Sequence, residues 1–439
     1  MEVGQILDAE ESSADDIRED LEKTEKGGVR QTLNNCVTVL RRDPVLKGVI
    51  RKNELTERMD IIKPLGWKRS GGTAIRDTDI FQIELYLENE YGLMKDRLIN
   101  KAISIVANEN SYHPIRDYLE SLTWDGKSRI DKVLTRYLGV DNNYYTWEIM
   151  GLFMEAAIER IYNPGCKFEL MMCLVGGQGA GKSTFFRFLA GKDEWFSDDL
   201  RRIDDDQVYR KLVGHWIIEM SEMIATVNAR SIEDIKSFIS RQKETYKIPY
   251  ETHPADRPRQ CVFGGTSNNL DFLPLDRTGN RRFAPVLVHP ERVEKHILED
   301  EKEAREYFRQ MWAEALVRYK KSKTHELKLS PMAEGYLKEM QKQFMPEDTK
   351  LGIIQAWLEE CNEEYVCSTM IYKEALGHEA SEPKNWETRE INSIMNDAIS
   401  GWEAVTSHRF RDYGIQRGWK RVSKDDGFVP AREEEIPFG

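Results

Sequence analysis

Short apolar runs alternate with helical stretches in the middle of the chain. The runs lie at Leu170–Val175, His215–Met220 and Gln260–Gly264, and the sequence between them has helical periodicity. Runs of this length that end in turn residues are typical of buried strands. Because the strands alternate with helices, the pattern predicts an α/β fold with a largely parallel sheet.

On the N-terminal side of this core, the pattern predicts helices and shows no catalytic signature. Residues 29–138 have helical stretches around a polar turn at 69–72, and Asp125–Lys127 marks a tight turn between helices. We expect this region to serve packing or coupling.

On the C-terminal side, a long helix at 301–323 precedes a linker at Met345–Asp348. Residues 368–377 and 387–400 then predict two helices joined by a turn, and residues 407–424 predict a basic wing of two strands. The expected parts of the chain are therefore an acidic tail at 1–26, a helical N-terminal domain at 27–140, the α/β domain with its helical extension at 141–345, a winged-helix-like domain at 346–424 and an acidic tail at 425–439.

Composition limits the class of protein. The 439 residues are 40% hydrophobic, which is enough to bury a core in each of about three domains. No window approaches about eighteen uninterrupted apolar residues, and the acidic N-terminus is unlike a signal peptide, so we expect a cytoplasmic protein without a membrane partner. The six cysteines form no Cys-x-x-Cys pair, which predicts neither a zinc site nor a disulfide framework.

The net charge of −12 is concentrated at the two ends of the chain. Residues 1–26 carry −7 and residues 425–439 carry −4, which leaves −1 for the body. The overall acidity therefore does not exclude a nucleic-acid partner, because basic clusters lie inside a nearly neutral body.

A glycine-rich turn after the first apolar run fits the pattern G-x-x-x-x-G-K-[ST]. Glycines let backbone N–H groups converge on phosphate oxygens, Lys182 can reach the β- and γ-phosphates, and the Ser183 hydroxyl can hold Mg²⁺. A dinucleotide site is the nearer alternative, but Lys182 stands where G-x-G-x-x-G needs its last glycine. The sequence thus predicts ATP and Mg²⁺ at Gly176, Gly177, Gln178, Gly179, Ala180, Gly181, Lys182, Ser183 and Thr184.

Hydrolysis also needs carboxylates beside the phosphates. Glu219 ends the stretch that begins Trp216-Ile-Ile in the second apolar run, and Glu222 follows three residues later, so both can project from the carboxyl edge of the sheet. We expect Ser183 and Glu219 to hold the metal. Which of the two acids activates water stays open at this point.

Two further segments contribute polar side chains. Asn268 follows the third apolar run, where a γ-phosphate sensor would lie between the first strand and the carboxylate strand. An asparagine-rich turn that caps the strand is the alternative. Arg281 and Arg282 come thirteen residues later, and an arginine that reaches a neighbouring subunit's γ-phosphate accelerates hydrolysis. A salt-bridged surface pair is the alternative for the arginines.

The chain resembles the virulence-associated protein E family of phage and mobile-element P-loop ATPases on five segments in a fixed order: GGQGAGKS, WIIEMSEM, IKSFISRQKETYKIPY, RPRQCVFGGTSN and DRTGNRRFAPV. That family is similar to superfamily-3 helicases and poxvirus-type primase-helicases. The resemblance reaches from Asn35 to about residue 340 and implies an AAA+-like P-loop NTPase core in the cytoplasm of a bacterial host. It implies Walker B acids at Glu219 and Glu222, sensor 1 at Asn268, and a finger between subunits of a hexameric ring at Arg281 or Arg282.

In rings of the superfamily-3 type, the segment before the third apolar run is a β-hairpin that points into the central channel. Here the segment offers cations for phosphates and aromatic rings for base stacking, which suits single-stranded or forked DNA. A surface hairpin with ordinary charge is the alternative. The resemblance implies contacts from Lys247, Tyr250, His253, Arg257 and Arg259.

The predicted wing is a second candidate surface for nucleic acid. Residues 407–424 contain six Arg or Lys and one acid, Asp412. Many winged helices bind protein instead, so both kinds of partner stay open. The acidic end at Glu433–Gly439 resembles the tip of bacterial single-stranded-DNA-binding proteins, which docks on host or phage replication proteins; an acidic tail without a partner is the alternative. The wing residues that we expect to contact DNA are Arg409, Arg411, Arg417, Lys420 and Arg421.

These features together predict a DNA-stimulated ATPase that acts as a ring helicase in phage or mobile-element replication. An ATP-dependent loader that separates no strands is a second interpretation, and an unwinding assay distinguishes it. A DNA-binding regulator whose nucleotide controls oligomerisation is a third, and retained function in Lys182→Ala would favour it.

Overall fold

The computed structural model describes residues 13–69, 71–200, 203, 208–221, 229–246, 255–274, 280–322 and 324–422. The chain divides into two compact units, of which one comprises Met1–Phe272 with Arg281–Phe344 and the other Leu273–Asn280 with Met345–Gly439. Within the described ranges, no helix combines the length and the apolar character needed to cross a membrane.

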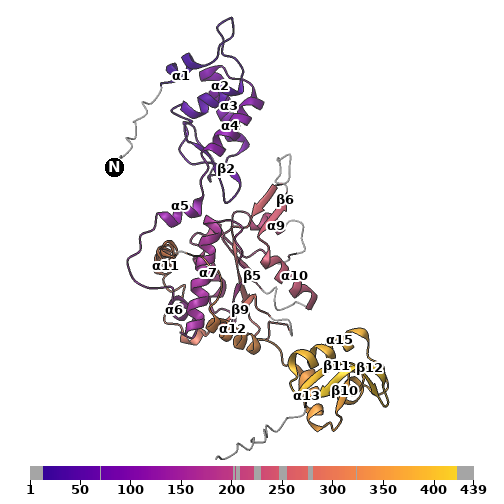
Figure 1. The fold of residues 1–439 in the computed structure, drawn as a ribbon. Helices are drawn as coiled ribbons and strands as arrows, with labels where there is room; N and C mark the ends of the chain where they lie inside the picture. Colours follow the sequence, from indigo (N-terminus) through magenta and orange to yellow (C-terminus); the bar gives the residue numbers. More distant parts are fainter. Residues whose placement is uncertain are drawn as a thin grey trace, which may run out of the picture. The chain divides into compact units, whose positions relative to one another are not determined.

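A five-stranded sheet forms the centre of the first unit (Figure 1). Its strands are β3 (Met171–Val175), β4 (Phe196–Ser197), β5 (Ile217–Ser221), β8 (Val262–Ser267) and β9 (Phe283–Leu287). All neighbours run parallel in the spatial order β4–β5–β8–β3–β9. The predicted α/β fold with a parallel sheet is therefore confirmed.

Burial on both faces explains why the apolar runs form strands. Every residue of β3 and β8 is buried, as expected for parallel strands covered on both sides. Gly264 of β8 lies directly against Phe186, because a Cβ atom there would come within 2.3 Å of the ring. The close packing of helix on sheet thus depends on a glycine at this position.

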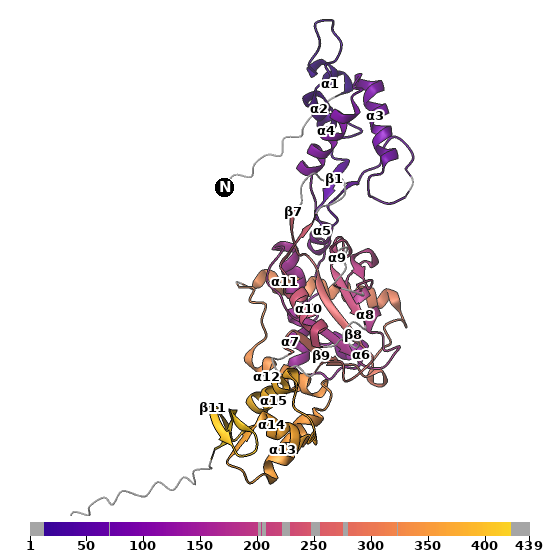
Figure 2. The same ribbon diagram turned by 90° about the vertical axis from the view of Figure 1, so that its right-hand side faces the viewer.

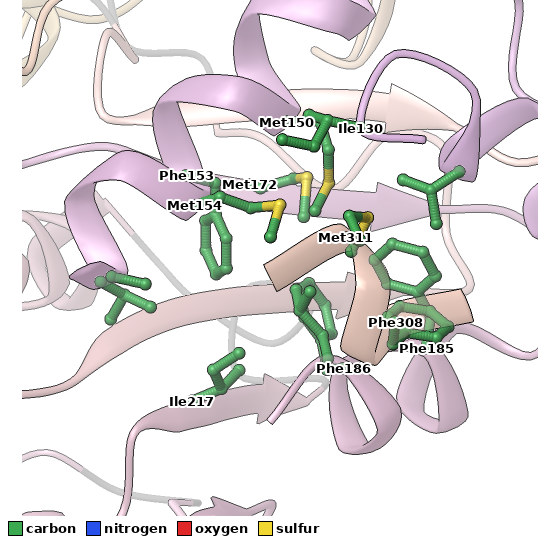
Figure 3. Packing of buried hydrophobic residues seen from close by; sticks show 14 of the residues in the cluster. Ile130, Met150, Phe153, Met154, Met172, Phe185, Phe186, Ile217, Phe308 and Met311 are labelled. Atoms are coloured by element: carbon green, nitrogen blue, oxygen red, sulfur yellow. The ribbon is translucent and has the colours of Figure 1, made fainter. Parts of the chain in front are cut away.

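Several helices share an apolar core with the sheet. The helix α7 lies against β3 and β8 (Figure 2). Figure 3 shows Met150 and Phe153 packed in one cluster with Phe186, Phe308 and Met311. The helices of this part are α7 (Tyr144–Tyr162), α8 (Lys182–Leu189), α9 (Val208–Leu212), α10 (Ala229–Ser240), α11 (Glu301–Lys321) and α12 (Pro331–Gln343), with the 3₁₀ turns η1 (Asp193–Trp195) and η2 (Pro290–Arg292).

Two buried tryptophans join three of these helices. The rings of Trp216 and Trp312 stack with centroids 4.2 Å apart. Trp216 Nε1 donates to the carbonyl oxygen of Ala157 in α7 at 2.9 Å, and Trp312 Nε1 donates to that of Leu189 in α8 at 2.7 Å. Each buried indole therefore keeps a hydrogen-bond partner, and α11 is fixed to α7 and α8.

Residues 13–112 form a lobe of the first unit with its own apolar core. The lobe contains α1 (Ala14–Asp20), α2 (Leu33–Arg42), α3 (Asp77–Tyr91), α4 (Asp96–Glu109) and the antiparallel hairpin of β1 (Ile50–Asn53) and β2 (Arg58–Ile61). The hairpin corrects the expectation of a purely helical region. Its strands are only four residues long, and Arg51 and Lys52 interrupt the apolar pattern.

The prediction of an acidic tail at residues 1–26 is also wrong for the second half of this segment, which contains a helix. A capping box at Ser13 begins α1, and Ile17 and Leu21 are buried in the core of the lobe. These two apolar residues lie four positions apart, so they share one face of the helix while the acids face solvent. The charge of this segment concealed an amphipathic helix.

The lobe ends well before the expected boundary at residue 140. The helices α5 (Pro114–Glu120) and α6 (Val133–Leu138) contribute Ile115 and Tyr137 to the core around the sheet. The predicted turn lies between these two helices, where Asp125 Oδ1 accepts a hydrogen bond from the Lys127 amide at 3.0 Å.

The second unit contains a helix, a strand, two further helices and two further strands. The predicted pair of helices and pair of strands is present, and α13 and β10 are additional. The three strands form an antiparallel sheet in the order β10–β12–β11. The elements are α13 (Thr349–Glu360), β10 (Tyr365–Cys367), α14 (Ser368–Met370) with the π-helix η3 (Ile371–Ala375), α15 (Asn385–Ser393) with the π-helix η4 (Ile394–Ala398), β11 (Trp402–Phe410) and β12 (Gly414–Arg421).

Candidate functional site

The glycine-rich loop joins β3 to α8 at the carboxyl edge of the sheet. Gly179 and Gly181 have φ angles of 80° and 79°, in the left-handed region that glycine adopts without strain. Gly181 is the N-cap of α8, so Lys182 is the first residue of the helix. The unpaired N–H groups of the first helical turn therefore face the same space as the loop, which favours an anion there.

Lys182 extends back across the loop. Its ammonium group donates to the carbonyl oxygens of Gly176 and Gly177 at 2.7 Å each and to Asn268 Oδ1 at 3.0 Å. Burial lowers the pKa of this ammonium, whereas the negative charge of Glu219 acts in the opposite direction. All three of these acceptors are neutral, so the cation is positioned but not neutralised by them.

Glu219 connects the loop helix to two strands. The residue is fully buried, and its Oε1 accepts hydrogen bonds from Ser183 Oγ at 2.7 Å and from Thr266 Oγ1 at 2.6 Å. Its Oε2 is buried and has no hydrogen-bond partner among the described residues. Burial raises the pKa of the Glu219 carboxyl, while the two hydroxyl donors oppose that shift.

These oxygens suit a magnesium ion. Carboxylate and hydroxyl oxygens are the hard ligands that Mg²⁺ prefers, and Glu219 and Ser183 supply one of each. A buried polar atom without a partner requires an explanation, and a cation coordinated by Glu219 Oε2 would provide one. The residues present therefore fit the metal that the sequence predicts.

Asn268 is directed at the loop, and its neighbour forms the turn. The strand β8, which Asn268 follows, lies between β3 and β5, as the sequence predicts. The Asn268 side chain accepts from Lys182, whereas Asn269 closes the turn through its hydrogen bonds with Ser267 Oγ. Glu222, the other predicted acid, lies outside the described residues.

A cavity of about 380 Å³ lies over the loop. Its walls include Gln178–Thr184, Ser221 and Thr266–Asn268, together with His296 and Leu298. The last two residues were not predicted, since no sequence motif marks the segment after β9. The only signal for them was indirect, because parallel pairing of β9 with β3 brings this segment beside the loop.

Arg281 and Arg282 lie at the opposite edge of the sheet. They precede β9, and the four steps along β9 alone separate them from the loop edge by about 13 Å. Arg282 Nε donates to Ser240 Oγ at 2.7 Å, whereas Arg281 is exposed. The structure thus brings neither arginine to the loop of its own chain. The two arginines differ in their surroundings, because Arg282 is hydrogen-bonded within the fold whereas Arg281 is exposed.

The predicted hairpin is present as β6 (Lys243–Tyr246) and β7 (Ala255–Pro258), which pair in antiparallel fashion. Arg259 at its base is buried, where it donates to the carbonyl oxygen of Phe238 at 2.7 Å and pairs with Glu244. The prediction that Arg259 contacts nucleic acid is therefore wrong, because its guanidinium is used inside the fold.

Arg257 is directed toward the N-terminal lobe. Its guanidinium pairs with Glu57 at 3.3 Å, and only 12% of its side chain is exposed. This contact joins the hairpin base to the turn between β1 and β2 and leaves little of Arg257 for a ligand. The other predicted hairpin contacts, Lys247, Tyr250 and His253, lie outside the described residues.

The basic residues of the second unit divide into two kinds. Arg421 is half-buried and donates through one nitrogen to the carbonyl oxygens of Leu358, at 2.9 Å, and Cys361, so it fastens β12 to α13. Four other basic residues of the predicted wing are exposed, and Ile415, opposite Arg409 in the ladder, is 69% exposed among them. These exposed residues are Arg409, Arg411, Arg417 and Lys420.

Comparison with known proteins gives one family and a larger set of solved structures, among them two of the NrS-1 C-terminal region. A virulence-associated protein E-like domain matches residues 119–346, which is just over half of the chain. An A-form apo structure of the NrS-1 C-terminal region shares 14% identity and a TM-score of 0.48, and covers 90% of this chain and 100% of its own. A second structure of that region shares 12% identity and a TM-score of 0.46, with coverage of 85% and 96%. A search of curated proteins returned no match.

Proposed function

The chain belongs to the family of virulence-associated protein E-like domains, and on this premise we propose that it is an ATP- and Mg²⁺-dependent motor on DNA. The observation that carries the proposal is the convergence of Lys182, Ser183 and Glu219 at the glycine-rich loop, with one buried carboxylate oxygen left without a described partner. If Glu219 had only a structural role, the fold would not need a buried carboxylate oxygen that lacks a partner among the described residues.

In this proposal the loop holds the phosphates of ATP. Lys182 exchanges its carbonyl acceptors for phosphate oxygens, which neutralise its charge better than neutral groups do. Ser183 and Glu219 hold Mg²⁺, which when bound screens the charge of the phosphates. Asn268, already within hydrogen-bond distance of Lys182, is suited to orient the γ-phosphate or the attacking water.

The sheet supports a P-loop core of the AAA+ type. The resemblance to superfamily-3 helicases implies a sensor strand between the loop strand and the acidic strand, and β8 has that place. Arg281 and Arg282 lie at the far edge of the sheet, so an arginine finger would have to act on a neighbouring subunit. We therefore propose a ring, hexameric by the same resemblance, and assign the finger to Arg281 because it is exposed while Arg282 bonds to Ser240.

For DNA we propose the wing of the second unit. Its order of helices and strands supports a winged-helix fold, and Arg409, Arg411 and Arg417 are exposed beside the apolar Ile415. Each arginine that contacts a phosphate contributes close to one unit to the salt dependence of binding. Replacing all three by alanine should therefore weaken binding of the full chain to DNA and flatten its dependence on salt concentration.

The decisive experiment is steady-state ATP hydrolysis with and without single-stranded DNA. We expect DNA-stimulated turnover that falls by at least about 10²-fold in Lys182→Ala, since this residue contacts the transferred group. Lys342→Ala is the matched control, because Lys342 is 67% exposed on α12. Absence of turnover in the unmodified chain at any DNA concentration would contradict the proposal.

Unwinding is the finer part of the proposal and needs its own assay. A forked duplex labelled on one strand should release that strand only when ATP is hydrolysed. Turnover with DNA stimulation but without strand release would instead identify a loader or assembly switch.

A further inference from the structure

The cavity over the glycine-rich loop is bounded on its two sides by different elements. On one side lie β8 and β5, which bring Asn268 and Ser221 to the wall of the cavity. On the other side lies β9, whose following segment returns beside the loop. A Cβ atom at Gly181 would meet Ile297 Cγ2 at 3.2 Å, so this segment touches the start of α8.

The segment is firmly anchored, although it belongs to no helix or strand. Ile297 is 1% exposed and is part of the central core. The backbone N–H groups of Glu294 and Lys295 both donate to the carbonyl oxygen of Arg136, at 3.1 and 3.3 Å. Side chains on either side of Ile297 are therefore held in place at the wall of the cavity.

Those two side chains, His296 and Leu298, have complementary chemistry. Leu298 is 52% exposed, and it contributes an apolar side chain to a cavity whose other walls are mostly polar. His296 Nδ1 accepts a hydrogen bond from the Leu298 amide at 3.2 Å. In the neutral imidazole the proton then lies on Nε2, which is free of this internal bond and can donate to a ligand.

We infer that His296 and Leu298 bind the nucleoside end of the nucleotide. This inference rests on the proposed function, which fixes the phosphates at Lys182 and the metal at Ser183 and Glu219. The nucleoside must then leave the loop on the side away from β5 and β8, and that is where the segment after β9 lies. Leu298 packs against the heterocyclic base, since a planar ring needs an apolar surface, and His296 Nε2 donates to an acceptor of the base or ribose.

Calorimetric titration of the full chain separates the two ends of the ligand. The two probes are MgADP, which carries a nucleoside on its phosphates, and magnesium tripolyphosphate, which carries phosphates alone. We expect Leu298→Ala and His296→Ala each to weaken ADP binding by about 5- to 10-fold, while tripolyphosphate affinity stays within about twofold. Leu85→Ala is the matched control, because Leu85 is 49% exposed on α3, far along the chain from the loop.

Three results would overturn the inference, and they are distinguishable from one another. Unchanged ADP affinity in both variants would mean that the segment does not touch the nucleoside. An equal loss for ADP and tripolyphosphate would place the two residues at the phosphates instead. An unmodified chain that binds neither ligand would overturn the proposed function as well, whereas the first two results would leave it intact.

Discussion

The negative charge of Glu219, which the proposed function needs, is unfavourable for the stability of the fold. A fully buried carboxyl with one oxygen lacking a described partner is unfavourable in its charged form, which is why burial raises its pKa. We predict that Glu219→Gln lowers ATP hydrolysis by at least about 10²-fold yet leaves the free energy of unfolding unchanged or higher by about 1 kcal/mol, since the neutral amide keeps the shape without the charge. Phosphate release and urea unfolding measure the two effects.

The raised pKa of Glu219 also predicts the direction in which metal binding changes with pH. A protonated carboxyl cannot coordinate Mg²⁺, so affinity for the Mg²⁺–nucleotide complex should fall as the pH drops through the raised pKa of Glu219, at higher pH than for an ordinary glutamate. Glu219→Gln should lose this component of the pH dependence. Glu339→Gln, at a residue whose side chain is 68% exposed, is the control. A destabilised Glu219→Gln variant with unchanged hydrolysis would reverse the assignment.

Residues with a local motif could be predicted from the sequence, and residues defined by packing could not. The spacing from Gly176 to Ser183, the acid at the end of a buried strand and Asn268 after the next strand all meet in one cavity or hydrogen-bond network. Arg259 and Arg421 carry the same charge as true surface arginines, but carbonyl oxygens inside the fold accept their hydrogen bonds. Charge along the chain does not reveal where a guanidinium finds its acceptors.

Among the elements, β8 depends on a glycine beneath α8. A methyl group at position 264 would lie 2.3 and 2.4 Å from Phe186 Cζ and Cε1, and that ring is itself fully buried. We predict that Gly264→Ala destabilises the first unit by about 1–3 kcal/mol, because the ring cannot move without disturbing the core. Urea unfolding followed by tryptophan fluorescence measures the change.

A second glycine provides the control for this prediction. Gly335 lies in α12, and no neighbouring atom lies within 4 Å of the place that a methyl group would take there. Gly335→Ala should therefore stabilise the helix by about 0.5–1 kcal/mol. If both substitutions raised stability, backbone entropy and not contact with Phe186 would explain the effect at position 264.

The long or strongly patterned elements could be predicted, and the short ones were missed. The strands β3, β5 and β8 were visible as apolar runs because both of their faces are buried. The hairpin β1–β2 has four-residue strands with partly exposed cations, and the acidity of α1 hid two core positions. The boundary at residue 140 failed because α5 and α6 are helical like the lobe before them yet pack on the sheet after them.

At the scale of the whole molecule, the positions of the two arginines bear on the proposed ring. The glycine-rich loop is at the carboxyl edge of the sheet, and Arg281 precedes β9 at the amino edge. A single chain therefore has both halves of the proposed catalytic site but cannot bring them together. This geometry supports a closed ring, in which each interface joins the loop of one subunit to the arginine of the next.

Mixing two inactive variants tests that arrangement. Lys182→Ala removes the loop lysine and Arg281→Ala removes the finger, so each alone should lose ATP hydrolysis, the second by about 10³-fold or more. In rings assembled from equal amounts of both, about a quarter of the interfaces join an intact loop to an intact arginine, and that share of activity should return. Arg282→Ala is the control: it should keep its activity and lose only the stability that its bond to Ser240 provides. Mixed rings that form by mass measurement but stay inactive would show that Arg281 does not act on the neighbouring loop.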